Sequence, residues 1–155
     1  MIRFRKATIE DAKLLFDWRN DPLTRQMSRT TEPVEWTGHV EWLTKRLERQ
    51  ESDLFIFELA GRPVATIRID GDEVSYTVAP EDRGHGIATE MLKIIREHFG
   101  SLKAEIFPHN IASIKAAAAA GMQIVLLPVL QNDNQSVRSI ATAESTGPRR
   151  APDTM

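Results

Sequence analysis

Three short apolar runs joined by two tight turns constrain the fold of this chain more than any other feature. The runs are Leu54–Leu59, Val64–Ile69 and Val74–Val78, and all three are rich in β-branched and aromatic residues. Gly61 lies in the first connection and an Asp-Gly pair at 70–71 in the second. Because these residues adopt the positive φ of tight hairpin turns, the sequence predicts an antiparallel three-stranded meander.

Two helices are predicted before the meander. Ile2–Lys6 alternates like a short strand, and Thr8 with Asp11 resembles a capping box that opens a helix through Trp18. We expect Asp21-Pro22 to end that helix. A second helix is expected from about Pro33, because its apolar residues recur at a period near 3.6. These are Trp36, Val40, Leu43 and Leu47.

After the meander, helices and strands alternate. An apolar stripe predicts a helix over Ile87–Gly100, followed by a strand at Leu102–Phe107. A last helix is expected from Asn110 to Gly121, where a glycine stops it, and Ile124–Leu127 reads as a further strand. This order predicts an α/β (α+β) fold, and no internal repeat is found.

Composition excludes several classes of function. The 155 residues are 41% hydrophobic and 27% charged, with a net charge of -2, so the chain lacks the basic field that would hold nucleic acid or an anionic membrane. Cysteine is absent, and the four histidines are spread out, so we expect no metal. No run approaches a membrane span and the start lacks the apolar core of a signal peptide, which predicts a cytoplasmic protein.

The aromatic residues end early in the chain. The last one is Phe107, and the sequence from Pro128 onward is polar with few large apolar side chains. Such a segment buries too little surface to offset its ordering entropy. We therefore expect a folded domain at 1–127 and a largely flexible tail at 128–155, with room for one edge strand at Ser136–Thr142.

The segment Arg83-Gly84-His85-Gly86-Ile87-Ala88 carries the clearest functional signal. Its two glycines allow a sharp turn with amide groups pointing inward, and the helix that follows adds unpaired amides and the positive end of its dipole. This arrangement predicts an anion cradle suited to a phosphate or pyrophosphate. Neither a P-loop nor a dinucleotide fingerprint fits, because no Gly-Lys-Ser/Thr follows and Thr89 stands where the third glycine belongs.

These residues resemble the GNAT N-acetyltransferase family, whose pyrophosphate loop reads Arg/Gln-x-x-Gly-x-Gly/Ala. Arg83, Gly86 and Ala88 match that loop, and Asn110-x-x-Ser-Ile with Gly121 matches a second family signature in spacing. The resemblance implies a mixed, mostly antiparallel central sheet with helices on both faces and a splay between the fourth and fifth strands. It also implies an acetyl-CoA-dependent enzyme.

The resemblance further implies where acetyl-CoA binds. Its pyrophosphate would lie on the amides of Arg83, Gly84, His85, Gly86, Ile87 and Ala88. Its pantetheine arm would run beside Val78, and Asn110 and Ser113 would lie along it. Two plainer interpretations stay open: the loop is only a turn that starts a helix, and Asn110 is only a helix cap.

Glu105 is the first candidate for a catalytic base. It coincides with the glutamate that serves as base in the ribosomal-protein N-terminal acetyltransferases that the chain resembles. The alternative is a strand carboxylate paired with Lys103 or another cation, and Glu73 is the second candidate. Many members carry a proton-donating tyrosine where this chain has Ala117. Tyr76 is expected to pack in the core, because alternation groups it with its apolar neighbours.

Acceptor recognition is expected from the first two helices. Trp18-Arg19-Asn20-Asp21-Pro22 and the segment around His39 resemble enzymes that acetylate nucleotide-linked 4-amino sugars, and the same opening occurs in enzymes acting on protein N-termini. We assign acceptor binding to residues that grip phosphates or stack on a base. These are Trp18, Arg19, Asn20, Arg29 and His39, with Arg25, Trp36 and Trp42 as further candidates. A plainer interpretation stays open. Tryptophans at helical spacing more often pack in a core than bind a ligand, and His39 is in that case only a surface residue.

The sequence thus predicts acetyl transfer from acetyl-CoA to the primary amine of an acceptor by direct attack in a ternary complex. The best interpretation of the acceptor is a nucleotide-linked amino sugar. The alternatives are a peptide N-terminus, a small-molecule amine, and a non-catalytic module that only binds acyl-CoA. The sequence leaves monomer and homodimer open.

Overall fold

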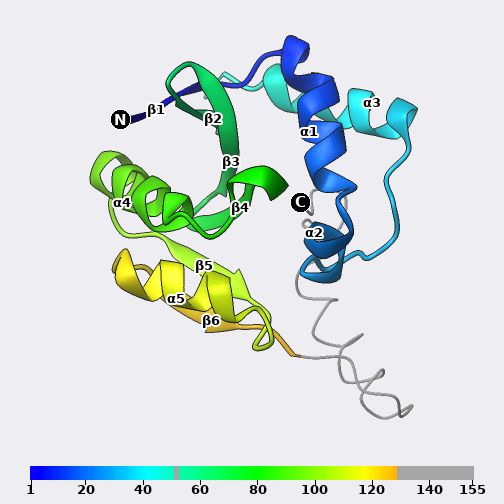
Figure 1. The fold of residues 1–155 in the computed structure, drawn as a ribbon. Helices are drawn as coiled ribbons and strands as arrows, with labels where there is room; N and C mark the ends of the chain where they lie inside the picture. Colours follow the sequence, from blue (N-terminus) through cyan, green and yellow to red (C-terminus); the bar gives the residue numbers. More distant parts are fainter. Residues whose placement is uncertain (51–52, 129–155) are drawn as a thin grey trace, which may run out of the picture.

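The fold is described from a computed structural model, which covers residues 1–50 and 53–128. The expected strand at 136–142 and the expected tail from residue 129 on lie outside the described residues. Within the described part, one sheet has the strand order β1-β2-β3-β4-β5-β6, so spatial order follows chain order (Figure 1). The strands are β1 Ile2–Lys6, β2 Leu54–Leu59, β3 Arg62–Asp70, β4 Glu73–Val78, β5 Lys103–Ile106 and β6 Gln123–Leu126.

The predicted meander is confirmed. β2, β3 and β4 pair antiparallel, as do β1 and β2, while β4-β5 and β5-β6 are parallel pairs. Gly61 and Gly71 have φ of 80° and 63° in the two tight turns. The sheet is therefore mixed and mostly antiparallel, as the family resemblance implies.

Helices connect the strands in the predicted order, with one correction. Asp21-Pro22 does not merely end the first helix, because it also begins another: the Asp21 carboxylate accepts a hydrogen bond from the Thr24 amide at 3.1 Å, and Pro22 takes the first helical position. The helices are α1 Ala12–Arg19, α2 Pro22–Gln26, α3 Trp36–Leu47, α4 Ile87–Phe99 and α5 Ile111–Ala119, with single 3₁₀ turns η1 Ile9–Asp11 and η2 Pro80–Asp82.

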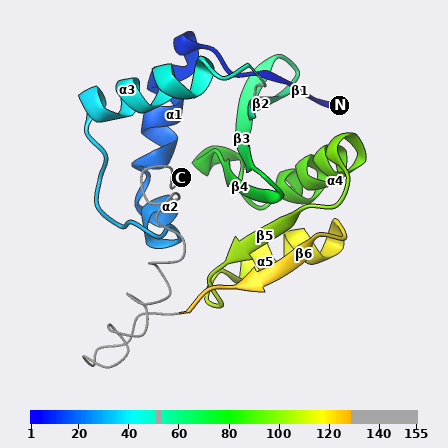
Figure 2. The same ribbon diagram turned by 180° about the vertical axis from the view of Figure 1, so that it is seen from behind.

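The sheet separates two apolar cores. On β2, Phe55 and Phe57 face the core under α4 and α5, whereas Leu54 and Ile56 face the core under α1 and α3. Figures 1 and 2 show these two groups of helices on opposite sides of the strands. This is the alternation expected of a strand buried on both faces.

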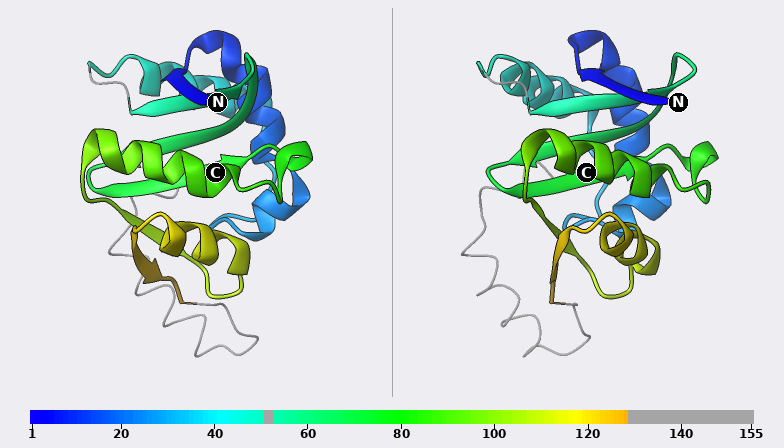
Figure 3. Two further views of the ribbon diagram at one scale, coloured as in Figure 1. Left: turned by 60° about the vertical axis from the view of Figure 1, so that its left-hand side comes forward. Right: turned by 90° about the vertical axis from the view of Figure 1, so that its left-hand side faces the viewer.

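The fourth and fifth strands separate after a short parallel pairing. Glu73 pairs with Lys103 and Val74 with Ala104, and beyond these two pairs the strands diverge. Figure 3 shows β5 and β6 turned away from the first four strands. The splay opens the sheet between β4 and β5 at the ends of both strands, and both cavities described below lie there.

The capping box predicted from Thr8 and Asp11 is present. The Asp11 carboxylate accepts hydrogen bonds from the Thr8 amide at 2.8 Å and from both terminal nitrogens of Arg5 at 2.9 Å. Burial alone would raise the pKa of Asp11, but the hydrogen bonds from Arg5 and Thr8 outweigh it and hold that pKa below its ordinary value. A carboxylate with a lowered pKa stabilises the fold above its unfolded-state pKa of about 3.9.

We expect Asp11→Asn to lower the free energy of unfolding by about 1–3 kcal/mol at neutral pH, because a buried charge-assisted pair is lost. The difference from wild type should shrink as the pH falls below about 4, where Asp11 becomes protonated in the unfolded chain and then in the folded one. Urea unfolding at several pH values measures this. Asp17→Asn, in an exposed pair with Lys13, is the matched control; an equal loss in both variants would contradict the assignment.

Candidate active site

The glycine loop before α4 forms the predicted cradle. Gly84 and Gly86 have φ of 80° and 77°, and Gly86 is the N-cap of α4. Among the described residues, no atom lies within 4 Å of a Cβ added at either glycine, so the space in front of the backbone is open. A positive φ, an open approach and the first amides of a helix together make a site for an anion.

A cavity of about 530 Å³ begins at this loop, a volume within the usual range for a small-molecule site. Every residue predicted to bind the cofactor lines it except His85. The His85 ring lies instead within 3.3 Å of the Asp82 carbonyl oxygen, outside the lining. The predicted residues in the lining are Val78, Arg83, Gly84, Gly86, Ile87, Ala88, Asn110 and Ser113. We call this space the cofactor cavity.

One face of α5 also lines the cofactor cavity, and this was not predicted. Ala112, Ala116 and Ala119 recur at helical spacing along it, with Lys115 beside them. From the sequence we expect only a helix in this segment. The spacing of the small residues was the signal that one face stays open for a ligand.

A second, smaller cavity of about 80 Å³ lies in the splay between β4 and β5. We call it the acceptor cavity. Its lining is polar and comes from the segment after α2, from β3 and from the two diverging strands. The polar side chains in it include Ser28, Arg29, Arg68, Ser75, Tyr76 and Glu105.

Glu105 is part of the acceptor cavity and forms an ion pair there with Arg29. Alternation on β5 is as predicted, because Ala104 and Ile106 are buried in the core while Glu105 points to the opposite face. Lys103 pairs with Asp72 at 3.8 Å, and Glu105 pairs with another cation, Arg29, as the second interpretation of this carboxylate allows. The structure thus joins two predicted site residues that are 76 positions apart.

Four residues line both cavities and form their junction: Met27, Tyr76, Asn110 and Ser113. The expectation that Tyr76 only packs in the core needs correction. Its ring packs against the core, but its hydroxyl reaches the junction, where it donates a hydrogen bond to the Ser113 carbonyl oxygen at 3.2 Å. This happens because β4 has left β5 by that point. Burial raises the pKa of Tyr76 above its ordinary value.

Asn110 caps a helix and also faces both cavities. Its side-chain oxygen accepts a hydrogen bond from the Ser113 amide at 3.3 Å, which makes it the N-cap of α5. It also lines both cavities. Glu73, by contrast, lies where β4 and β5 are still paired, is 6% exposed, and lines neither cavity.

Most of the residues assigned to acceptor binding lie elsewhere. Trp18 is buried in the core under α1 and α3, and the buried Arg19 guanidinium lies 5.8 Å from the centre of the Trp42 ring. His39 is 3% exposed and its Nε2 lies 2.9 Å from the Ala12 carbonyl oxygen, so it is not a surface residue either.

The Asn20 side chain bonds to the backbone of a distant residue and lines neither cavity. Its side chain bonds both backbone groups of Val34, at 2.8 and 3.0 Å. Of the assigned acceptor residues, only Arg29 lines either of these two cavities. The physical reason is that the others sit on the inward stripe of α1 and α3 or at helix ends, where they pack or cap.

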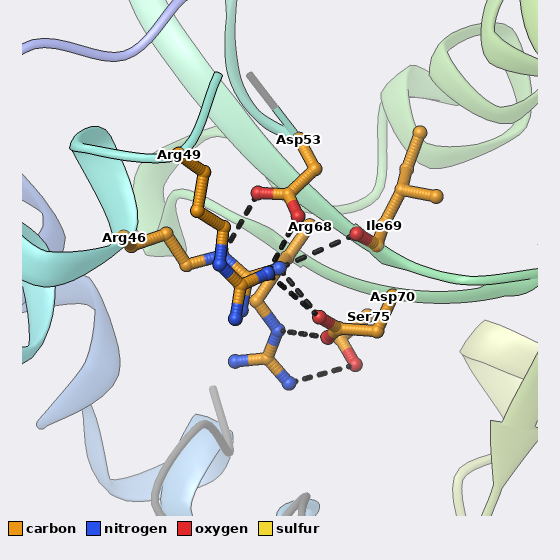
Figure 4. Close-up of polar contacts among 7 residues, drawn as sticks. All are labelled: Arg46, Arg49, Asp53, Arg68, Ile69, Asp70 and Ser75. Atoms are coloured by element: carbon orange, nitrogen blue, oxygen red, sulfur yellow. Dashed lines mark hydrogen bonds and ion pairs between the residues drawn. The ribbon is translucent and has the colours of Figure 1, made fainter. Parts of the chain in front are cut away.

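A network of arginines and aspartates forms the wall behind the acceptor cavity (Figure 4). Arg68, which lines the cavity, donates from Nε to Asp70 at 3.0 Å and from Nη2 to Ser75 at 3.3 Å. Arg46 bonds both Asp70, at 2.6 Å, and Asp53, at 3.0 Å. Burial alone would raise the pKa of Asp70, but Arg46 and Arg68 outweigh it and lower that pKa. The network fixes the Arg68 guanidinium at the cavity.

The fold and the two joined cavities are those expected of a two-substrate enzyme of the acetyltransferase class. The sequence profile described as "Acetyltransferase (GNAT) domain" matches residues 2–123, and the chain belongs to this family. It is therefore an N-acetyltransferase that uses acetyl-CoA. A comparison with curated proteins found no significant match.

Solved structures share the fold at low identity. An N-acetyltransferase from Staphylococcus aureus Mu50 is 22% identical, with a TM-score of 0.57 over 76% of this chain and 81% of that one. The aminoglycoside acetyltransferase AAC(6')-Ib, in complex with coenzyme A, is 16% identical, with a TM-score of 0.63 over 78% and 83%. A domain from Methanocaldococcus jannaschii DSM 2661 is 22% identical, with a TM-score of 0.58 over 78% and 87%.

Membrane-spanning helices and metal-binding clusters are both absent from the described residues. None of their helices has the length and apolar character needed to span a bilayer. Within the same part of the chain, no three His, Asp or Glu side chains are grouped so that they could hold a metal ion.

We expect Gly86→Glu to reduce the affinity for coenzyme A by at least about 100-fold, because it forces a side chain into a positive φ and places a negative charge in the anion cradle. Isothermal calorimetry with coenzyme A measures this. Gly38→Glu is the matched control, since an added Cβ at Gly38 in α3 meets no described atom within 4 Å. Unchanged affinity in the Gly86 variant would rule out the loop as the anion site.

Proposed function

We propose that this protein acetylates the primary amine of a small polar acceptor bound in the acceptor cavity. The observation that carries the proposal is the junction: the cofactor cavity and the acceptor cavity share Met27, Tyr76, Asn110 and Ser113, and Glu105 lines the acceptor cavity. A donor in one cavity and an amine in the other would meet there, which supports direct transfer without a covalent enzyme intermediate.

The residues of the cofactor cavity fit acetyl-CoA. The open glycine cradle and the start of α4 suit its pyrophosphate, and Val78 on the diverging β4 lies along the cavity toward the junction. Lys115 adds a cation to the wall of that cavity. Bound acetyl-CoA supplies an activated acetyl thioester; the remaining steps depend on the side chains of this chain.

Glu105 is proposed to remove a proton from the acceptor. A primary amine is mostly protonated at neutral pH and attacks only when neutral, so a nearby carboxylate that accepts the proton, directly or through water, speeds the reaction. The Arg29 guanidinium pairs with the Glu105 carboxylate, whose side chain is 17% exposed. Arg29 also fixes the carboxylate at the cavity wall.

Tyr76 is proposed to stabilise the departing thiolate. Among the four junction residues, Tyr76 and Ser113 carry hydroxyl groups, and a tyrosine is by far the more acidic donor of the two. Because burial raises the pKa of Tyr76, its hydroxyl stays protonated over the working pH range, and it can donate to the thiolate by leaving the Ser113 carbonyl oxygen, its partner in the free protein. Tyr76 on β4 would then take the proton-donating role that Ala117 cannot perform, because Ala117 is buried in the core and has no polar side-chain group.

The small volume and polar lining of the acceptor cavity support a small polar amine. About 80 Å³ accommodates the amine-bearing end of a molecule and not a nucleotide, which agrees with the position of Trp36 and His39 outside both cavities. A nucleotide-linked amino sugar would still place phosphates near Arg29, and a peptide N-terminus would also present an amine. Both belong in the assay panel with small amines and aminoglycosides.

The base assignment predicts that Glu105→Gln lowers kcat by about 10²–10⁴-fold on any acceptor that wild type acetylates, because a general base is lost. Release of free thiol from acetyl-CoA measures the rate. Coenzyme A affinity should stay unchanged, which separates chemistry from folding. Glu73→Gln is the control and should keep its activity. Absence of wild-type turnover on the whole panel, despite coenzyme A binding, would contradict the proposed function.

The tyrosine assignment predicts that Tyr76→Phe lowers kcat by about tenfold or more, the size expected for a lost hydrogen bond to a charged group. Tyr76 is the single tyrosine in the chain, so ultraviolet titration reports on it alone. We expect its pKa above 10 in the free protein and a further rise with coenzyme A at a pH where the thiol is ionised, but not with desulfo-coenzyme A. Equal titrations with both compounds would refute the contact with sulfur.

A further inference from the structure

We infer that Asp21 is a positioning residue that couples occupancy of the cofactor loop to the shape of the acceptor cavity, through a contact that we call the latch: Asp21, Thr24 and Arg83. The inference rests on the proposed function, because it concerns the same two cavities. It also gives a role to the Asp21-Pro22 part of a motif that the sequence analysis assigned to acceptor recognition.

The latch joins the glycine loop to α2. Arg83 Nη2 donates to Asp21 Oδ2 at 2.7 Å and to Thr24 Oγ1 at 2.9 Å. Arg83 is also one of the residues that line the cofactor cavity. Within residues 1–50 and 53–128, no acceptor is bonded to Nε or Nη1 of Arg83, so these donors can meet an anion in the cradle while Nη2 stays on Asp21.

Asp21 also accepts hydrogen bonds from Thr24, and these bonds tie the latch to α2. Its Oδ2 also accepts from the Thr24 amide at 3.1 Å and from the Thr24 hydroxyl at 3.2 Å, so the same atom caps α2 and holds Arg83. Burial alone would raise the pKa of Asp21, but Arg83 and the Thr24 amide outweigh it and lower that pKa. The carboxylate therefore stays charged at neutral pH.

Side-chain hydrogen bonds to the backbone close the chain around α2 into a loop, and we expect this loop to become ordered as one unit. The Asn20 side chain bonds the backbone of Val34, and Arg25 donates to the carbonyl oxygens of Asn20 at 3.2 Å and Thr31 at 3.1 Å. We call residues 20–34 the strap. Leu23 and Thr24 in the strap line the cofactor cavity.

The middle of the strap forms part of the acceptor cavity. Met27, Ser28 and Arg29 all line it, and Arg29 pairs with Glu105. A continuous set of contacts thus runs from the glycine loop through Arg83 and Asp21 to the strap, and from the strap to the proposed base. An anion in the cradle that orders Arg83 would order the strap, and with it the carboxylate that faces the acceptor.

Such coupling is reciprocal: a co-substrate that favours the latched strap is itself bound more tightly when the strap is latched. A partly exposed ion pair like this one is worth no more than about fivefold in an equilibrium constant. We therefore expect the latch to affect the ordering of the strap clearly and the affinity for coenzyme A only slightly.

Amide hydrogen exchange of residues 21–29, with and without saturating coenzyme A, tests the inference. In wild type, coenzyme A should slow exchange in this segment. Asp21→Asn keeps an oxygen that can cap α2 but loses the charge, and Arg83→Met keeps the stem but loses the donors. Both should lose at least half of the slowing, while Asp21→Asn keeps its coenzyme A affinity within about fivefold.

Matched variants keep the test independent of folding. Asp17→Asn removes an exposed carboxylate from α1 and should behave as wild type. Thr24→Val leaves Asp21 intact but removes one Arg83 acceptor, so it tests the latch if Asp21→Asn fails to fold. For an acceptor found in the panel, Asp21→Asn should raise KM more than it lowers kcat, whereas a loss of base would lower kcat.

Two results would overturn the inference: coenzyme A binds to wild type without slowing exchange in residues 21–29, or the Asp21 and Thr24 variants keep the full wild-type slowing. Failure of wild type to bind coenzyme A at all would instead count against the proposed function. The two failures are therefore distinguishable in one experiment.

Discussion

The early end of the parallel pairing between β4 and β5 is the constraint on which the rest of the structure depends. If Ser75 and Glu105 continued the ladder, backbone hydrogen bonds would fill the space where the two cavities now meet. Because the strands part, Tyr76 and Glu105 face an opening instead of a neighbouring strand. The enzyme thus obtains its junction from a local loss of sheet pairing on an otherwise rigid sheet.

The charged groups around that opening are held by ion pairs, two of which join distant parts of the chain. Arg29 reaches Glu105, Arg68 is fixed by Asp70, and Arg83 is held by Asp21. Each pair is partly or largely buried, where removing one member leaves a charge without its partner. The pairs therefore fix side chains that must be in place before a substrate arrives, which is what preorganised catalysis needs.

Local patterns predicted the fold well, and they predicted the backbone conformation of the glycine loop. The meander follows from β-branched runs with Gly61 and Gly71 between them, and the cradle follows from Gly84 and Gly86, because a positive φ is a property of the residue itself. Acceptor recognition was harder to predict. Trp18 and His39 are buried. The sequence could not predict this, because a helical stripe of aromatic residues has the same pattern whether it faces a core or a ligand.

By itself, the sequence determined the order of elements, the anion cradle and the family of the enzyme, since each depends on residues close together in the chain. Only the tertiary structure decided which charges meet across long separations, where Tyr76 points, and that Asp21 serves the glycine loop as well as α2. The physical reason is that a splay in a sheet and an ion pair between distant segments arise from packing, and packing leaves no local pattern in the sequence.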